Sequence, residues 1–370
     1  MGVWFSASAV APALASLWQL DDSGRAWLTM SVQGGFVAGA LASALLNLAD
    51  RIPAHLLFAW SALAAGASTA AIAAFADGLA PAVVLRFLTG FFLAGVYPVG
   101  MKIVATWTKE DRGLGIGLLV GALTIGSAAP HLLNVFGAAD DWRMLLYLAS
   151  AGTAAGGIIA ALFVRPGPYQ SAAPPFRWGY AAAILRDRPV LLANLGYLGH
   201  MWELYAMWAW IAVYLSSSLL GFVTIAAGGL GSFVAGIAAD RIGRTRVTII
   251  SMAISGACAL GIGALYHSPP AMLPAVAILW GFAIVADSAQ FSACVTELCD
   301  RQYLGTALTL QTSLGFLLTM LTIRMVPWVE AQIGRQWSFS VLAIGPALGI
   351  VAMAALAKHP AAQKLAGGRG

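Results

Sequence analysis

Charged residues are scarce in this chain of 370 residues. They make up 9% of it, whereas hydrophobic residues make up 60%. Soluble domains carry about 25% charged residues. This composition therefore excludes a water-soluble globular protein, and the 41 glycines are typical of helices that pack closely in lipid.

Several other signatures are missing. The three cysteines have no paired spacing, which argues against a disulfide framework or a zinc site. The N-terminus lacks the basic region and the cleavage site of a signal peptide. The basic residues behind the net charge of +5 are scattered singly, so we expect no nucleic-acid partner. Without a nucleotide-binding glycine-rich loop or a nucleophile–base pair, we expect neither an enzyme nor a cofactor.

Long apolar runs dominate what is present. About 20 mostly apolar residues span the hydrocarbon core as a helix, the structure that satisfies its own backbone in lipid. The runs predict an all-α membrane protein with twelve transmembrane helices. We place them at 3–20, 27–48, 55–76, 81–105, 114–136, 143–164, 189–215, 220–239, 247–267, 272–296, 304–328 and 337–357. The short first span and the abrupt turn near 216–220 predict that residues are missing before span 1 and between spans 7 and 8.

The distribution of Lys and Arg predicts the orientation. With the N-terminus inside, 15 of the 20 basic residues lie at cytoplasmic ends. Positive residues accumulate on the cytoplasmic side of membrane proteins. We therefore expect a multi-pass protein of the bacterial inner membrane with both termini in the cytoplasm. The basic residues at outer ends are Arg25, Arg86, Arg143, Arg324 and Arg335.

The chain also divides into two halves that repeat. Ala49-Asp50-Arg51-Ile52 recurs as Ala239-Asp240-Arg241-Ile242, and Asp111-Arg112 recurs as Asp300-Arg301, each pair in the matching loop. Two matches in register indicate a duplication. We expect an N-terminal bundle of six helices at 1–164, a cytoplasmic linker at 165–188, a C-terminal bundle at 189–357 and a tail at 358–370.

The loop after span 8 carries the strongest motif, Gly236-Ile-Ala-Ala-Asp240-Arg241-Ile-Gly243-Arg244. Gly236 permits close helix approach and Gly243 a tight turn, while Asp240 can pair with an arginine. Such contacts could latch one face closed. The first-half copy, at Asp50 and Arg51, lacks the turn glycine. Small residues at 35, 39 and 43 and at 228, 232 and 236 predict two further close helix contacts.

This loop motif resembles that of the major facilitator superfamily, as does Arg86-Phe-Leu-Thr-Gly90 in span 4. Span 5 resembles the antiporter motif only in part, because His131 follows Pro130 where glycines are expected. The segments Leu93-Ala-Gly-Val-Tyr-Pro98 and Val285-Ala-Asp-Ser-Ala-Gln-Phe-Ser292 loosely resemble the bacterial nitrate/nitrite and cyanate porter branch. The resemblance implies two pseudo-symmetric six-helix bundles around a cavity, alternating access and a small-molecule substrate. It directs Trp4, Arg86, Tyr97, His200 and Gln290 towards the substrate path.

Two acidic residues, Glu203 in span 7 and Asp287 in span 10, lie near mid-span. A charge at that depth costs at least about 2.5–3.5 kcal/mol, so such residues usually serve a function. We expect both to couple transport to protons, although each could instead be a structural hydrogen-bonding group. Span 7 presents Tyr197, His200, Glu203, Met207, Trp210 and Tyr214 on one face. His200 and Glu203 could also bind a metal, but no further ligand is present, and we expect none.

Three basic groups lie at a similar depth near the outer surface: Arg86, His131 and Arg324. We expect them to draw an anion inward, although both arginines could instead reach lipid headgroups. Gln311 in span 11 is a further candidate ligand.

Taken together, these features predict a proton-coupled symporter of a small, anionic solute, driven by the proton gradient without a cofactor and active as a monomer in the lipid bilayer. The alternatives are a proton-coupled exporter of amphipathic compounds and a membrane sensor on a transporter scaffold. A channel is disfavoured because the carboxylates form no ring.

Overall fold

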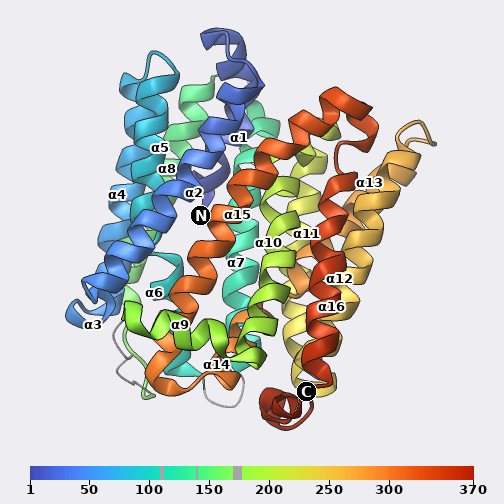
Figure 1. The fold of residues 1–370 in the computed structure, drawn as a ribbon. Helices are drawn as coiled ribbons and strands as arrows, with labels where there is room; N and C mark the ends of the chain where they lie inside the picture. The colour runs from blue at the N-terminus through green and yellow to red at the C-terminus, as the bar shows by residue number, and fades with distance from the viewer. Residues whose placement is uncertain (109–111, 139–140, 170–176) are drawn as a thin grey trace. The chain divides into compact units, whose positions relative to one another are not determined.

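The computed structural model describes residues 1–108, 112–138, 141–169 and 177–370, a part of the chain that is helical and contains no β-strand (Figure 1). Contacts divide the chain into two compact units. Unit 1 comprises residues 1–109, 125–171 and 208–223, and unit 2 comprises residues 110–124, 172–207 and 224–370. The division into sequential six-helix bundles stays a prediction.

The helices follow the expected apolar runs closely. Unit 1 contains α1 (Gly2–Trp18), α2 (Asp22–Leu45), α3 (Leu48–Arg51), α4 (Ala54–Phe75), α5 (Leu79–Leu93), α6 (Tyr97–Trp107) and α8 (Trp142–Phe163). Unit 2 contains α9 (Trp178–Arg186), α12 (Arg244–Gly261), α13 (Met272–Ala286), α14 (Ser288–Leu298), α15 (Leu304–Ile333) and α16 (Ile344–Ala357). Residues of α7 (Arg112–Leu133), α10 (Arg188–Tyr214) and α11 (Ser218–Ile242) belong to both units.

Among the described residues, ten segments are long and apolar enough to cross a membrane. They correspond to ten of the expected spans. The other two expected spans, at 3–20 and 189–215, correspond to α1, which has 17 residues, and to α10, which has 27. These ten segments confirm a multi-pass helical membrane protein, and the total of twelve spans remains a prediction.

Several expected spans contain a break or a change of helical pitch. The fourth consists of α5 and α6 with a turn at 94–96, where Gly95 and Pro98 weaken helical continuity. The fifth continues beyond Pro130 as the π-helical turn η1 (Asn134–Ala138). A proline within a helix removes a backbone bond, and such changes of helical pitch follow from it. The tenth breaks at Asp287, between α13 and α14.

Glycine contacts confirm the two predicted close approaches of helices. A Cβ atom at Gly35 of α2 would lie 1.9 Å from the carbonyl oxygen of Phe87 in α5, and one at Gly39 would lie 2.1 Å from that of Phe91. In unit 2, a Cβ atom at Gly228 of α11 would lie 2.8 Å from the carbonyl oxygen of Gly281 in α13. These backbones approach more closely than any side chain permits.

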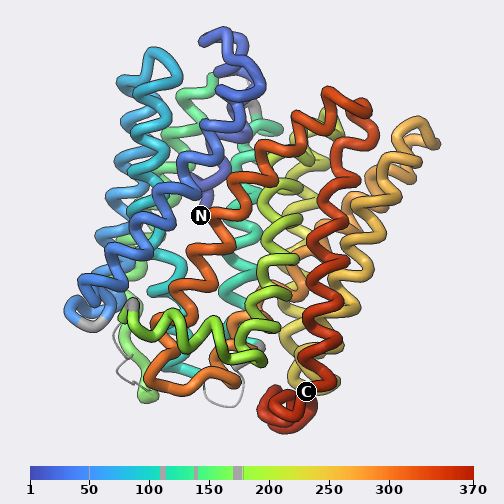
Figure 2. Tube along the Cα trace, in the orientation of Figure 1, coloured from blue at the N-terminus to red at the C-terminus, as the bar shows by residue number. Residues whose placement is uncertain are grey.

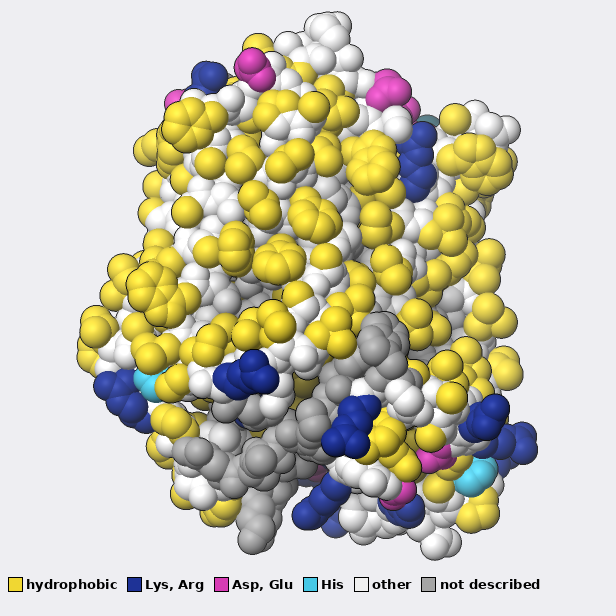
Figure 3. All heavy atoms as spheres, turned by 60° about the vertical axis from the view of Figure 1, so that its left-hand side comes forward, with side chains coloured by type: hydrophobic (Ala, Val, Ile, Leu, Met, Phe, Trp, Pro, Cys, Tyr) yellow, Lys and Arg dark blue, Asp and Glu magenta, His cyan; other side chains and the backbone are white. Residues whose placement is uncertain are grey.

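The outer surface of unit 1 is apolar. Trp60 and Phe75 of α4 and Phe163 of α8 are 69%, 80% and 76% exposed. On the face drawn in Figure 3, apolar side chains fill the middle and most charged side chains lie towards the two ends. Exposed apolar side chains between polar ends fit a surface that contacts lipid.

One helix forms within the expected linker at 165–188. Helix α9 packs against α15 with Ile184 buried, and it runs across α15 rather than alongside it (Figure 2). The linker's Pro174-Pro175 lies outside the described residues. Beyond α16, the short turns of η6 (Pro360–Gly367) fold back towards the α11–α12 turn.

Candidate functional site

Glu203 lies deep inside unit 2, where α10, α12 and α13 meet. Glu203 is 1% exposed. The indole Nε1 of Trp280 donates a hydrogen bond to its Oε1 at 2.6 Å, and the hydroxyl of Ser255 donates one to its Oε2 at 2.9 Å. Both carboxylate oxygens therefore have a donor, which is how a buried carboxyl group is made tolerable.

One helical turn earlier on α10, His200 pairs with Asp287. The His200 Nδ1 and Asp287 Oδ1 atoms are 2.9 Å apart, and both side chains are 2% exposed. The other ring nitrogen, Nε2, lies 2.9 Å from the hydroxyl of Ser288. The break between α13 and α14 places Asp287 and Ser288 at the two ring nitrogens of one imidazole. The spacing of His200 and Glu203 predicts a shared face, but their partners lie on different helices.

Arg86 lies in unit 1 and is fully buried. Its guanidinium donates hydrogen bonds to three backbone carbonyl oxygens. Nε bonds to Leu28 of α2 at 2.9 Å, Nη1 bonds to Val3 of α1 at 2.6 Å, and Nη2 bonds to Trp4. Trp4 in turn packs against Phe36 of α2 in a tilted arrangement, with ring centroids 5.2 Å apart. Arg86 thus ties α1, α2 and α5 together.

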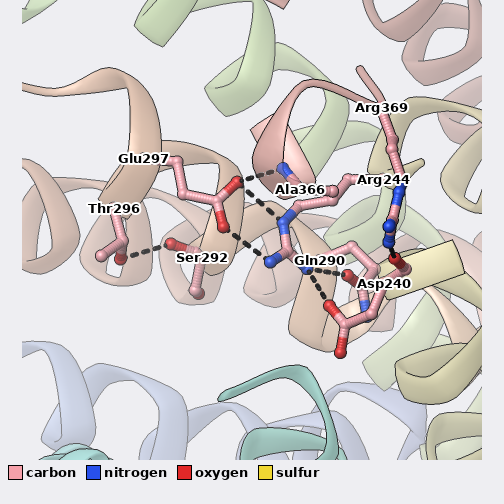
Figure 4. A network of polar contacts seen from close by, with 8 residues as sticks. All are labelled: Asp240, Arg244, Gln290, Ser292, Thr296, Glu297, Ala366 and Arg369. Carbon is pink, nitrogen blue, oxygen red and sulfur yellow. Dashed lines mark hydrogen bonds and ion pairs between the residues drawn. The ribbon is translucent and has the colours of Figure 1, made fainter. Parts of the chain in front are cut away.

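The predicted loop motif forms a polar network at one end of unit 2 (Figure 4). Arg244 is 4% exposed and binds both carboxylate oxygens of Glu297 on α14, at 2.9 and 2.6 Å. It also donates to Oε1 of Gln290 at 2.8 Å and lies 3.6 Å from Asp240. A bidentate arginine–carboxylate pair is among the stronger polar contacts in proteins. Gly243 holds φ at 100°, as a tight turn requires.

Helix spans, buried carboxyl groups and the loop network together favour a transporter, and comparison with known families decides the matter. The model of the Major Facilitator Superfamily matches residues 1–228, which is more than half of the chain. The chain belongs to the Major Facilitator Superfamily. A comparison with curated proteins found no match. Membership and the ten apolar helices identify a secondary transporter embedded in a lipid bilayer, of a family that is typically not enzymatic.

The remaining residues that the sequence predicts to line the substrate path are spread over both units. In unit 1, His131 is 2% exposed, Tyr97 is half-buried at the start of α6, and Trp210 is half-buried on α10. In unit 2, Arg324 is exposed on α15. Gln311 is 2% exposed and accepts a hydrogen bond from Ser292 at 3.3 Å. The basic layer of Arg86, His131 and Arg324 would draw on both units and stays a prediction.

Gln311 also borders a small cavity. It measures about 50 Å³ and lies between α9, α10 and α15, with Tyr197 and Asn194 in its wall. Gln290, another predicted substrate ligand, is fully buried and bonds to Arg244 instead of facing this cavity.

The two copies of the loop motif differ. Arg51 of the first copy is exposed at the end of α3, and Lys102 donates a hydrogen bond to the carbonyl of Ala49 at 2.6 Å. The side chain of Asp50 lies outside the described residues, as do Asp111 and the side chain of Arg112. In the second copy, Arg241 is exposed, and Gly236 lies 3.8 Å from the position of a Cβ atom on Gly117 of α7. The close approach predicted for Gly236 stays a prediction.

Sequence reasoning missed Glu297, the main partner of Arg244. It lies one residue beyond the predicted end of span 10, where an acidic residue was attributed to the loop. The buried arginine of the motif was the available signal, since such a charge needs a carboxylate nearby. Among the described residues, no cluster of three or more His, Cys, Asp or Glu side chains could hold a metal ion.

Proposed function

We propose that this chain is a proton-coupled symporter that takes up a small anionic solute by alternating access. The observation that carries the proposal is the buried contact between His200 and Asp287. A carboxylate against an imidazole, inside helices that cross the membrane, offers a place where a proton can be bound and released. Glu203 is the second proton-binding candidate, and its two donors favour a more static role.

Protonation of Asp287 would weaken its attraction to His200. Asp287 lies where α13 ends and α14 begins, so a change in this contact acts at a break between two helices. A ligand shifts a conformational equilibrium by its differential affinity for the two states. A proton that binds better when the pair is separated would therefore favour one state of the cycle.

An anionic substrate is supported by Arg86. Its hydrogen bonds go to neutral carbonyl groups, and within the described residues it forms no ion pair with a carboxylate. Its full positive charge therefore remains available to attract an anion. We propose that His131 and Arg324 add to this attraction, and that Tyr97, Trp210 and Gln311 contribute to the substrate path.

The Arg244 network is proposed as a latch of the transport cycle. It holds the α11–α12 turn to α14 through Glu297 and Gln290. We further propose twelve spans in two six-helix bundles, both termini in the cytoplasm of a bacterium, a functional monomer and a loose relation to nitrate/nitrite porters.

Uptake into proteoliposomes tests the function. Under an inward proton gradient, a panel of small anions, neutral solutes and lipophilic cations would be offered to the wild type. We expect accumulation of an anion that a protonophore abolishes. Asp287→Asn should reduce this accumulation to downhill equilibration, because the variant cannot exchange the proton. Asp77→Asn, an exposed carboxylate between α4 and α5, serves as the matched control and should behave as the wild type.

Other outcomes would contradict parts of the proposal. Gradient-driven extrusion of lipophilic cations would favour the exporter, and solute binding without transport would favour the sensor. Loss of coupling in Glu203→Gln with normal coupling in Asp287→Asn would move the proton site to Glu203.

A further inference from the structure

Residues 360–370 pack against the α11–α12 turn of the same unit. Leu365 is fully buried and Ala362 is 6% exposed, so the segment has an apolar anchor. Thr245 at the start of α12 donates a hydrogen bond to the carbonyl oxygen of Gly370 at 2.7 Å. The guanidinium of Arg369 donates one to the carbonyl oxygen of Asp240 (Figure 4). The segment therefore contacts both sides of the turn.

Gly243 gives a second, independent sign that this contact is built into the turn. A Cβ atom at this position would lie 2.4 Å from the carbonyl oxygen of Arg369 and 2.5 Å from that of Gly370. The tail backbone thus occupies the space that a side chain at 243 would need. Glycine at position 243 therefore permits the positive φ and also leaves room for the backbone of residues 369 and 370.

Glu297 joins the tail to the latch. Its Oε2 accepts a hydrogen bond from Arg244 Nε at 2.9 Å and another from the backbone N–H of Ala366 at 3.0 Å. One carboxylate oxygen thus binds the turn and the tail together. Movement of Arg244 away from Glu297 would also disturb the contact of the tail.

We propose that residues 360–370 are a strap that holds the α11–α12 turn against α14 and must detach when the latch opens. The surface that holds this segment consists of the Asp240 carbonyl, the Gly243 backbone, the Thr245 hydroxyl and the Glu297 carboxylate. Its partner is this segment of the same chain. The inference rests on the proposed latch of the transport cycle, and it adds a segment that regulates that latch.

Hydrogen exchange tests the docking of the strap in the full chain. Thr245→Val removes one donor at nearly constant shape, and Leu365→Ser removes the apolar anchor. With both changes, amides of 361–370 should exchange at least about tenfold faster, since loss of a hydrogen bond and an apolar contact favours local opening. Thr248→Val, whose hydroxyl bonds to Thr245 O, and Gln363→Ala, which changes an exposed side chain, are the matched controls. Unchanged exchange in the double variant, or equally fast exchange in the controls, would overturn the docking.

Thiol labelling tests the effect on the latch. Cys294 is fully buried on α14, on the same face as Gln290 and Glu297. In a Cys258→Ser, Cys299→Ser background, a maleimide should label Cys294 about three to ten times faster once the strap is released. Labelling at the wild-type rate despite fast tail exchange would overturn the strap.

Neither measurement uses substrate or a proton gradient. Failure of proton symport would appear as absent uptake with the exchange and labelling results unchanged. If the strap proposal is wrong, uptake will be normal and the labelling rate of Cys294 will not change. Monodisperse gel filtration of each variant excludes misfolding as the cause of either result.

Discussion

The carboxyl groups of Glu203 and Asp287 are equally buried but differ in what surrounds them. Glu203 receives one hydrogen bond at each oxygen, from an indole and a hydroxyl that carry no charge. Asp287 contacts an imidazole, which can itself hold a proton. Because a coupling site must exchange protons during the cycle, the His200–Asp287 pair suits it better. The hydrogen bonds of Glu203 instead connect α10 to α12 and α13, which is a structural role.

If Glu203 connects these three helices, removal of one of its hydrogen-bond donors should lower the stability of the protein. Trp280→Phe keeps an aromatic ring but leaves Glu203 Oε1 without its donor at 2.6 Å. We expect a loss of about 1–3 kcal/mol in the free energy of unfolding, as for a buried acceptor that is left without its donor. Thermal unfolding in detergent measures it. The matched control is Trp60→Phe, 69% exposed on α4, which should change the unfolding temperature little. An equal shift in both variants would contradict the role.

Helices α2 and α5 approach so closely that glycine is required between them. Gly35→Ala would place a methyl group 1.9 Å from the Phe87 carbonyl oxygen, so the two helices must separate. Overpacking of this kind costs about 1–3 kcal/mol. Gly152→Ala on α8 is the control, because its added methyl group meets no atom within 4 Å. In thermal unfolding, the first variant should be destabilised and the second should match the wild type or exceed it. Wild-type stability of Gly35→Ala would show that the contact is looser than described.

The sequence predicted the positions of the helices well, because apolar length and polar breaks are local properties. It could not predict which helices become neighbours. The spacing of His200 and Glu203 places them on one helix face. In the fold, however, Asp287 contacts His200, whereas Trp280 donates a hydrogen bond to Glu203. Glu297 and the helix at 178–186 were missed for the same reason, since each depends on a contact distant in the chain. The family resemblance places Gln290 on the substrate path, whereas its bond to Arg244 depends on a contact that only the fold provides.

For the whole molecule, the described residues and the family together establish a secondary transporter with many membrane spans. The orientation of the chain in the membrane decides which side each set of helix ends faces. The excess of basic residues at one set of helix ends is the physical basis for the proposed orientation. In the proposed orientation, the latch and the strap at 360–370 would face the cytoplasm.

Cysteine accessibility tests this orientation directly. Asp77, between α4 and α5, and Gln363, in the strap, are both exposed, and we propose that they lie on opposite sides of the membrane. In right-side-out vesicles, a membrane-impermeant maleimide should label Asp77→Cys at once and Gln363→Cys only after permeabilisation. The three native cysteines are buried, so the unchanged chain serves as the unlabelled control. The reverse pattern would invert the topology and place the latch outside. Labelling of both sites from one side would contradict an odd number of spans between α4 and the strap, and with it the count of twelve.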